Sequence, residues 1–160
     1  MSLNRITLFT CLLLASLTGQ ASDAPPMPKT IGAAWVYSVE GDYHDVKSDL
    51  VDAIKSRGIV LSYVAHAASM LQRTAAAVGA IGKAYDNADI LLFCKADLTY
   101  QLTIKNPHNI ALCPYSISIY TLPTDWKHVY LSIRAPNPAV PEYAPVQALL
   151  EEIIAETMDW

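Results

Sequence analysis

The sequence predicts an α+β fold, a two-layer sandwich in which helices cover one face of a mixed or mainly antiparallel sheet. Strand-like and helix-like hydrophobic periods alternate along the chain in the order β-α-β-α-β-α-β-β-α. The tight turn Pro123-Thr124-Asp125 joins two neighbouring strands into a hairpin. With 160 residues, of which 52% are hydrophobic and 16% charged, the chain has enough apolar material for one packed domain.

The first half of this pattern begins with a strand over Trp35–Glu40, where apolar and polar residues alternate. A helix should follow from Asp42 to about Arg57, since its acidic start suits the first helical turn and Gly58 ends it. Ile59–Ala67 is the second expected strand. We expect Ser69 to cap a further, alanine-rich helix that runs through Ala80.

The second half begins with a short buried strand over Asp89–Cys94. A helix over Asp97–Lys105 should end at Asn106-Pro107, because the residue before a proline disfavours helical geometry. The hairpin strands are expected at Tyr115–Leu122 and Trp126–Arg134. A final helix should span Ala144–Met158, where apolar residues recur at helical spacing.

The N-terminus has the pattern of a secretory signal peptide over Met1–Ala21. Arg5 supplies its positive charge, and the apolar stretch Ile6–Leu17 is shorter than the roughly 20 residues that span a bilayer. We expect an extended leader over residues 22–33, followed by a single domain over residues 34–160. These features predict a periplasmic or secreted protein with no membrane segment after cleavage.

Net charge limits the partners. The formal charge is −4, and removing residues 1–21 takes away Arg5 and no acid, so the mature chain would carry −5. Lys and Arg are scattered along the chain rather than clustered. Both observations argue against nucleic acid as a partner.

One sheet face offers a candidate binding surface. Side chains on a strand alternate between faces, so the apolar residues of the hairpin should pack under the helices. The remaining face would be polar and aromatic, as binding surfaces are. Its candidate ligand-binding residues are His66, Ser116, Ser118, Tyr120, Tyr130 and Arg134.

Two segments give the sequence a family resemblance. The run Gly58–Ala67 (GIVLSYVAHA) resembles the strand-plus-histidine opening of the DUF302 family, and Cys113–Tyr120 (CPYSISIY) followed by Val129-Tyr130-Leu131 is similar to its hairpin. The block Lys105–Tyr115 is similar to a secreted proteobacterial branch. The resemblance implies a small α+β domain, seen as dimers in family members, with no settled activity. Some members are similar in genomic setting to sulfur-oxidation or redox proteins.

The two cysteines outside the signal segment, Cys94 and Cys113, end one expected strand and precede another. If these strands are neighbours, the cysteines come within disulfide reach, which favours a structural disulfide. A redox or sulfur-handling role for the pair is the alternative. A third hypothesis is a metal or haem site, with weak candidates His66, Cys94, His108 and Cys113.

The sequence contains none of the GxSxG, HExxH, Walker or Rossmann motifs, so we assign no catalytic residue. We expect no cofactor, although the metal and haem hypothesis stays open. The leading interpretation is a non-enzymatic binding or accessory domain that uses the polar, aromatic sheet face to bind its ligand. Its candidate partners are a small ligand, a periplasmic redox protein or a second copy of the chain.

Overall fold

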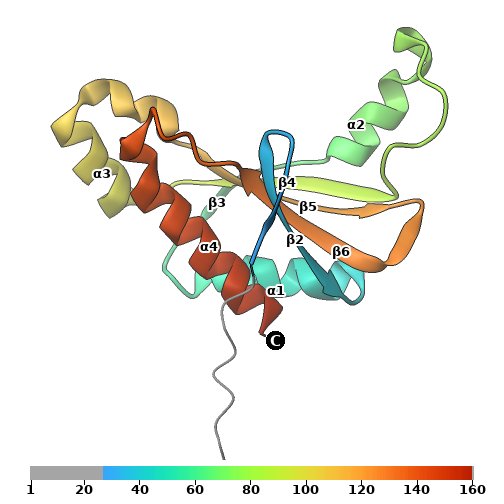
Figure 1. Cartoon of the computed structure of the whole chain (residues 1–160), viewed down its shortest axis with the longest axis horizontal. Coiled ribbons are helices and arrows are strands. Elements are labelled where there is room, and N and C mark those ends of the chain that lie inside the picture. The colour runs from blue at the N-terminus through green and yellow to red at the C-terminus, as the bar shows by residue number, and fades with distance from the viewer. Residues whose placement is uncertain (1–26, 160) are drawn as a thin grey trace, which may run out of the picture.

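The computed structural model describes residues 27–159, which form six strands, four α-helices and three short 3-10 turns (Figure 1). The strands are β1 Lys29–Ile31, β2 Ala34–Glu40, β3 Leu61–Ala65, β4 Asn87–Phe93, β5 Tyr115–Leu122 and β6 Asp125–Arg134. The helices are α1 Tyr43–Lys55, α2 Ala67–Thr74, α3 Ala96–Lys105 and α4 Ala144–Met158, and the 3-10 turns are η1 Ala76–Val78, η2 Pro107–Leu112 and η3 Pro141–Tyr143.

The strands form one sheet in the order β1-β2-β6-β5-β4-β3, and every neighbouring pair is antiparallel. This arrangement confirms the predicted α+β class with an antiparallel sheet. The hairpin of β5 and β6 occupies the middle of the sheet. The edges are β1 and β3.

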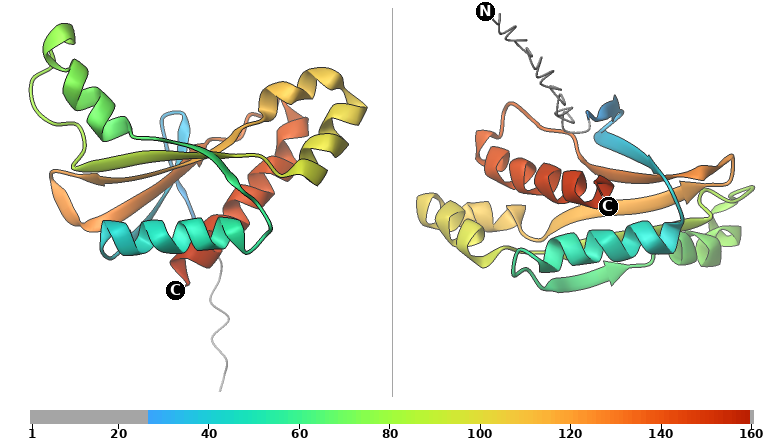
Figure 2. Two further views of the ribbon diagram at one scale, coloured as in Figure 1. Left: turned by 180° about the vertical axis from the view of Figure 1, so that it is seen from behind. Right: turned by 90° about the horizontal axis from the view of Figure 1, so that it is seen from below.

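The helices divide into two pairs. Figures 1 and 2 show α1 and α4 side by side across one face of the sheet, whereas α2 and α3 project from opposite ends of it. Arg57, which follows α1, forms an ion pair with Glu156 of α4 and so ties the two covering helices together. The expectation that the helices cover one face therefore holds for α1 and α4 alone.

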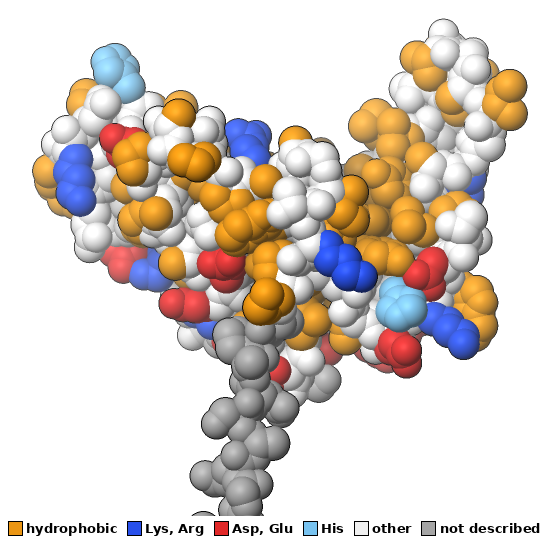
Figure 3. Space-filling model, in the orientation of Figure 1, with side chains coloured by type: hydrophobic (Ala, Val, Ile, Leu, Met, Phe, Trp, Pro, Cys, Tyr) orange, Lys and Arg blue, Asp and Glu red, His pale blue; other side chains and the backbone are white. Residues whose placement is uncertain are grey.

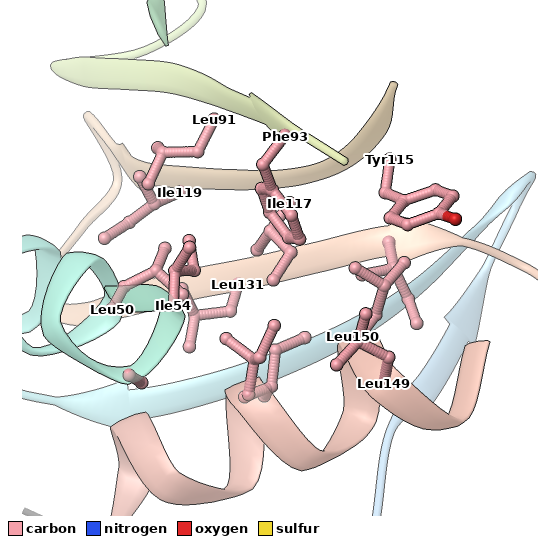
Figure 4. Packing of buried hydrophobic residues seen from close by; sticks show 14 of the residues in the cluster. Leu50, Ile54, Leu91, Phe93, Tyr115, Ile117, Ile119, Leu131, Leu149 and Leu150 are labelled. Atoms are coloured by element: carbon pink, nitrogen blue, oxygen red, sulfur yellow. The ribbon is translucent and has the colours of Figure 1, made fainter. Parts of the chain in front are cut away.

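The core fills the space between α1, α4 and the sheet. Figure 4 shows Leu50 and Ile54 of α1 and Leu150 of α4 pointing toward side chains from the central strands. Ile117 and Leu131 from the hairpin are fully buried there. No helix formed by residues 27–159 packs on the other face of the sheet, and we call this face the open face.

Two elements differ from the expectation. Lys29–Ile31, expected within the leader, forms strand β1 because it pairs with Ala34–Val36 of β2 across a turn at Gly32, whose φ is 58°. Helix α2 covers Ala67–Thr74 instead of Ser69–Ala80, with His66 at its N-cap. The Ser69 hydroxyl does not cap the helix, since it accepts a hydrogen bond from Arg73.

The expected signal peptide over residues 1–21 and most of the expected leader lie outside the described residues. Among residues 27–159, no helix has the length and apolar character needed to cross a membrane.

Candidate functional site

A groove of about 700 Å³ lies where β3 ends and α2 begins. Its walls come from α1, α2 and β4, and we call it the edge groove. Strand β3 pairs with β4 only as far as Ala65 and Ile90, so residues Asn87–Asp89 of β4 extend past the end of β3 and line the groove. The chain turns away from the sheet at His66 to enter α2, and this turn creates the opening.

The carboxylate of Asp89 lies at the centre of the groove wall. Asp89 sits on the helix-covered face of β4, opposite Ile119 of β5, and only 7% of its surface is exposed. The Tyr43 hydroxyl donates to its Oδ2 over 2.8 Å, and the Lys47 ammonium donates to the same oxygen over 2.5 Å. Nδ1 of His66 lies 2.7 Å from Oδ1. Three hydrogen-bonding partners thus surround one buried carboxylate.

The local sequence explains why these side chains converge. Asp42 caps α1 by accepting hydrogen bonds from the backbone N–H groups of His44 and Asp45. Tyr43 and Lys47 are four residues apart in the helix and therefore share one face, which is turned toward β4. His66 reaches the same carboxylate from the end of β3.

The environment fixes the charge of the site. Burial acts to raise the pKa of Asp89, but hydrogen bonds from Lys47, His66 and Tyr43 outweigh it and hold the pKa below its usual value. Burial and the contact with Asp89 raise the pKa of Tyr43, so its hydroxyl remains a donor. An ionised carboxylate only accepts hydrogen bonds, so the neutral tautomer of the imidazole that suits this contact has its proton on Nδ1. This tautomer leaves Nε2 as an acceptor on a side chain that is 68% exposed.

The structure separates His66 from the other predicted binding residues. A β-bulge between Leu61 and Tyr63 shifts the register of β3, so that Val64 pairs with Leu91 while Tyr63 pairs with Leu92. Strict alternation predicted His66 on the polar face, but its ring contacts Asp89 on the helix-covered side instead. The placement of His66 on the polar face is therefore wrong.

The other five residues lie on the open face, on β5 and β6. Tyr120 stacks on Tyr130 with ring centres 5.3 Å apart and planes 14° from parallel. Tyr85, from the loop before β4, meets the Tyr120 ring edge-on at 5.3 Å. The five residues that share this face are Ser116, Ser118, Tyr120, Tyr130 and Arg134.

The profile of the family described as "Domain of unknown function DUF302" matches residues 35–159. The chain belongs to the DUF302 family. Its fold is similar to the crystal structure of an uncharacterized conserved DUF302 protein from Bacillus stearothermophilus, with a TM-score of 0.55 and 14% sequence identity. That match covers 81% of this chain and 94% of the Bacillus chain. No curated protein matches the chain.

The matched segment of this DUF302 protein contains every lining residue of the edge groove and the five predicted binding residues of the open face. Asp89, Tyr43 and Lys47 were not predicted as site residues. Asp89 did carry a signal, because it is an acid at the start of the apolar strand run Ile90–Phe93. Tyr43 and Lys47 carried none, since both suit an ordinary helix surface.

Cys94 and Cys113 form a disulfide in this DUF302 protein, with Cα atoms 5.8 Å apart. The register of β4 and β5 explains the pairing, because Phe93 lies opposite Tyr115 and the cysteines flank this pair. The predicted proximity of the two cysteines is thus confirmed. The bond fastens both ends of the segment that contains α3 and η2.

The four candidate metal ligands do not come together. Strands β3 and β4 are antiparallel, so His66 after β3 and Cys94 after β4 lie at opposite ends of the pair. His66 therefore does not reach the end of the sheet where the two cysteines lie. Within residues 27–159, no three His, Cys, Asp or Glu side chains are grouped as metal ligands.

Proposed function

We propose that this DUF302 protein is a binding domain that takes a small, uncharged, hydrogen-bonding ligand in the edge groove, with His66 as the contact residue. The observation that carries the proposal is an exposed imidazole held by a buried carboxylate. Burial of a charge costs several kcal/mol unless donors compensate it. Apolar packing alone would stabilise this edge of the sheet more simply, so the polar arrangement favours a binding role.

The carboxylates of the groove are paired and so do not favour a cationic ligand, and Arg73, which also lines the groove, donates a hydrogen bond to the Ser69 hydroxyl. Lys47 neutralises Asp89, and Lys83 forms an ion pair with Asp86 at the rim. Tyr63 and Met70 add exposed apolar surface to the lining. A small alcohol or amide suits this combination, because its O–H or N–H group can donate to Nε2 of His66 while its carbon atoms contact the apolar wall.

The test is a fragment titration followed by amide resonances of the ¹⁵N-labelled protein. A panel of small alcohols and primary amides should shift resonances from β3, the start of α2 and Asn87–Asp89. We expect the variant His66→Ala to remove these shifts while core resonances stay unchanged. His108→Ala, at a histidine on the 3-10 turn after α3, is the matched control and should bind like the parent protein.

Two results would overturn the proposal. One is a panel that leaves all groove resonances unmoved at millimolar concentration. The other is a set of shifts that persists in His66→Ala, because the ligand would then bind independently of the imidazole.

We also propose that a second copy of the chain covers the projecting arm formed by α2, η1 and the loop up to Asp86, which we call the α2 arm. Helix α2 contains no buried residue. Val78 and Ile81 are 74% and 102% exposed, and Leu71, Val78 and Tyr85 line a hollow of about 240 Å³ beneath the arm. Figure 3 shows hydrophobic side chains gathered in the notch between the arm and the body.

The exposed area is of the right size for a dimer. Met70, Leu71, Val78 and Ile81 of the arm, together with Tyr63 of the adjacent strand β3, expose on the order of 600 Å² of side chain, judged from ordinary side-chain sizes. Each partner of a stable interface buries about 800 Å². A short helix without a packed face is marginal by itself in water, so contact with a second arm would stabilise it.

We infer that the protein acts outside the cytoplasm. The signal-peptide pattern of Met1–Ala21 supports this location, and so does a disulfide, since such bonds persist in oxidising compartments. Expression of the full chain in a Gram-negative host should yield protein in the periplasmic fraction that begins at Ser22. Uncleaved protein in the cytoplasmic fraction would contradict the inference.

A further inference from the structure

A second, smaller cavity lies at the other end of the open face from the α2 arm. Its volume is about 210 Å³, and it lies where η2 leads into β5 and where the chain leaves β6 toward η3. Leu112, Pro114 and Val140 supply apolar walls, and Ser116 and Asn137 supply polar groups. We call this cavity the Arg134 pocket, after the cation in its lining.

Arg134 is the last residue of β6, and alternation along the strand places it on the open face, since its neighbour Ile133 is buried in the core. Among residues 27–159, no carboxylate lies within salt-bridge distance of its guanidinium. The pocket lining contains neither Asp nor Glu. Arg134 therefore brings a positive charge to the pocket that no lining residue neutralises.

Several other lining residues of the pocket are polar or half-buried. Burial raises the pKa of Tyr143, a lining residue, and the positive charge of Arg134 opposes that rise. The Asn137 side-chain oxygen accepts a hydrogen bond from the Ala139 backbone N–H, which turns that oxygen toward its own loop. Its amide nitrogen and the Ser116 hydroxyl are further hydrogen-bond donors among the lining residues.

We propose that the Arg134 pocket binds the carboxylate of a small apolar acid, held by the guanidinium with its hydrocarbon part against Leu112, Pro114 and Val140. A guanidinium matches a carboxylate in shape and forms two parallel hydrogen bonds with it. The pocket is smaller than the roughly 300 Å³ at which sites for drug-sized ligands begin. A free short-chain acid and the C-terminal residue of a peptide share this chemistry and both fit.

This site is independent of the edge groove. None of its lining residues belongs to the groove, so the failure of one proposal leaves the other unaffected.

The experiment uses the protein without its predicted signal segment, labelled with ¹⁵N, and three probes: butyrate, N-acetylleucine and N-acetylleucinamide. Butyrate represents a free acid, and N-acetylleucine represents the end of a peptide. N-acetylleucinamide has the same shape as N-acetylleucine but no charge. We expect at least one acid to give saturable shifts at residues 111–116 and 134–140, and we expect the amide to bind at least ten-fold more weakly.

Variants assign the binding to Arg134. Arg134→Gln should weaken binding of the acids at least ten-fold, and Arg73→Gln, an exposed arginine on α2, is the matched control that should leave it unchanged. Butyrate binding alone identifies a free acid as the source, and N-acetylleucine binding alone identifies a chain terminus. Absence of binding by both acids would overturn the proposal, as would equal binding of the amide or undiminished binding to Arg134→Gln.

Discussion

Asp89 illustrates how a single buried acid can organise a site. Three side chains from two separate elements donate to it, and together they hold its pKa below the usual value although burial acts in the opposite direction. Tyr43, Lys47 and His66 are therefore held in place by the same carboxylate. Loss of its charge should affect stability and the orientation of His66 together.

The variant Asp89→Asn tests this coupling through the pH dependence of stability. The pKa of Asp89 in the folded protein is lower than the ordinary value of about 3.9, so its stabilising contribution is present above about pH 5 and is lost as the pH falls further. We expect Asp89→Asn to lower the free energy of unfolding at pH 7 by about 1–3 kcal/mol. Urea unfolding of the parent protein and of Asp89→Asn, repeated at several values from pH 3 to pH 7, measures the free energy of unfolding of each.

The difference between the parent protein and Asp89→Asn should shrink toward acidic pH, because the parent then loses the same charge. A difference that stays constant over the whole range would show that the variant acts through packing rather than through charge.

Asp125 offers a second measurable charge at the surface. Hydrogen bonds from Tyr130 and then His128 lower the pKa of Asp125 to about 2. The hydroxyl of Tyr130 is the first of these causes, and it lies 2.5 Å from Asp125 Oδ2. Tyr130→Phe should therefore raise the pKa of Asp125 toward its ordinary value while keeping the ring stacked on Tyr120.

Carboxyl ¹³C chemical shifts followed against pH would report the pKa of Asp125 directly. Tyr120→Phe serves as the control, since its hydroxyl does not contact Asp125. An unchanged titration of Asp125 in Tyr130→Phe would contradict the assignment of the main cause to that hydroxyl.

At the scale of elements, periodicity predicted the sheet well. The final helix has the predicted bounds, Ala144–Met158, and the hairpin strands match within one residue. These segments bury one face against the core, so their hydrophobic pattern specifies them directly. Helix α2 buries nothing, and its start was misplaced because no packed face constrains it. The bulge in β3 also lacks a local signal, so the face of His66 could not be read from alternation.

The disulfide between Cys94 and Cys113 should stabilise the segment that contains α3 and η2. The cysteines are 19 positions apart, and closing a loop of this length contributes about 3 kcal/mol. We expect the double variant Cys94→Ala/Cys113→Ala to lose about this amount in urea unfolding and to show weaker amide protection in α3. The fully reduced parent protein is the matched comparison.

The resistance of this bond to reduction distinguishes a structural disulfide from the redox hypothesis. Thiol titration of native protein in a mild reductant should detect no free thiol. Rapid appearance of two thiols without unfolding would instead support a redox or sulfur-handling role for the pair.

At the scale of the whole molecule, the α2 arm is the part of the structure with the least internal packing. The body between α1, α4 and the sheet is fully packed, whereas the α2 arm exposes its apolar side chains. Composition could not reveal this division, because it counts apolar residues without placing them. The sequence predicted the class of the fold, which the structure confirms, and offered a second copy as one candidate partner, for which we propose the α2 arm as the contact surface.

We expect the protein to be a dimer in size-exclusion chromatography with light scattering. Leu71→Glu combined with Val78→Glu should give a monomer, since two charges would then lie in the hollow beneath the α2 arm. Gln101→Glu, which adds a charge at an exposed position of α3 away from the arm, should remain dimeric. A parent protein that runs as a monomer at 100 μM would contradict the proposal.

The edge strands of the sheet limit association of the chain beyond the proposed dimer. β1 is only three residues long and exposed at each of them, and β3 has five residues and a bulge. Short or irregular outer strands are poor templates for adding further strands from other chains. The protein can therefore place apolar surface on an arm without exposing a long, regular edge to open-ended polymerisation.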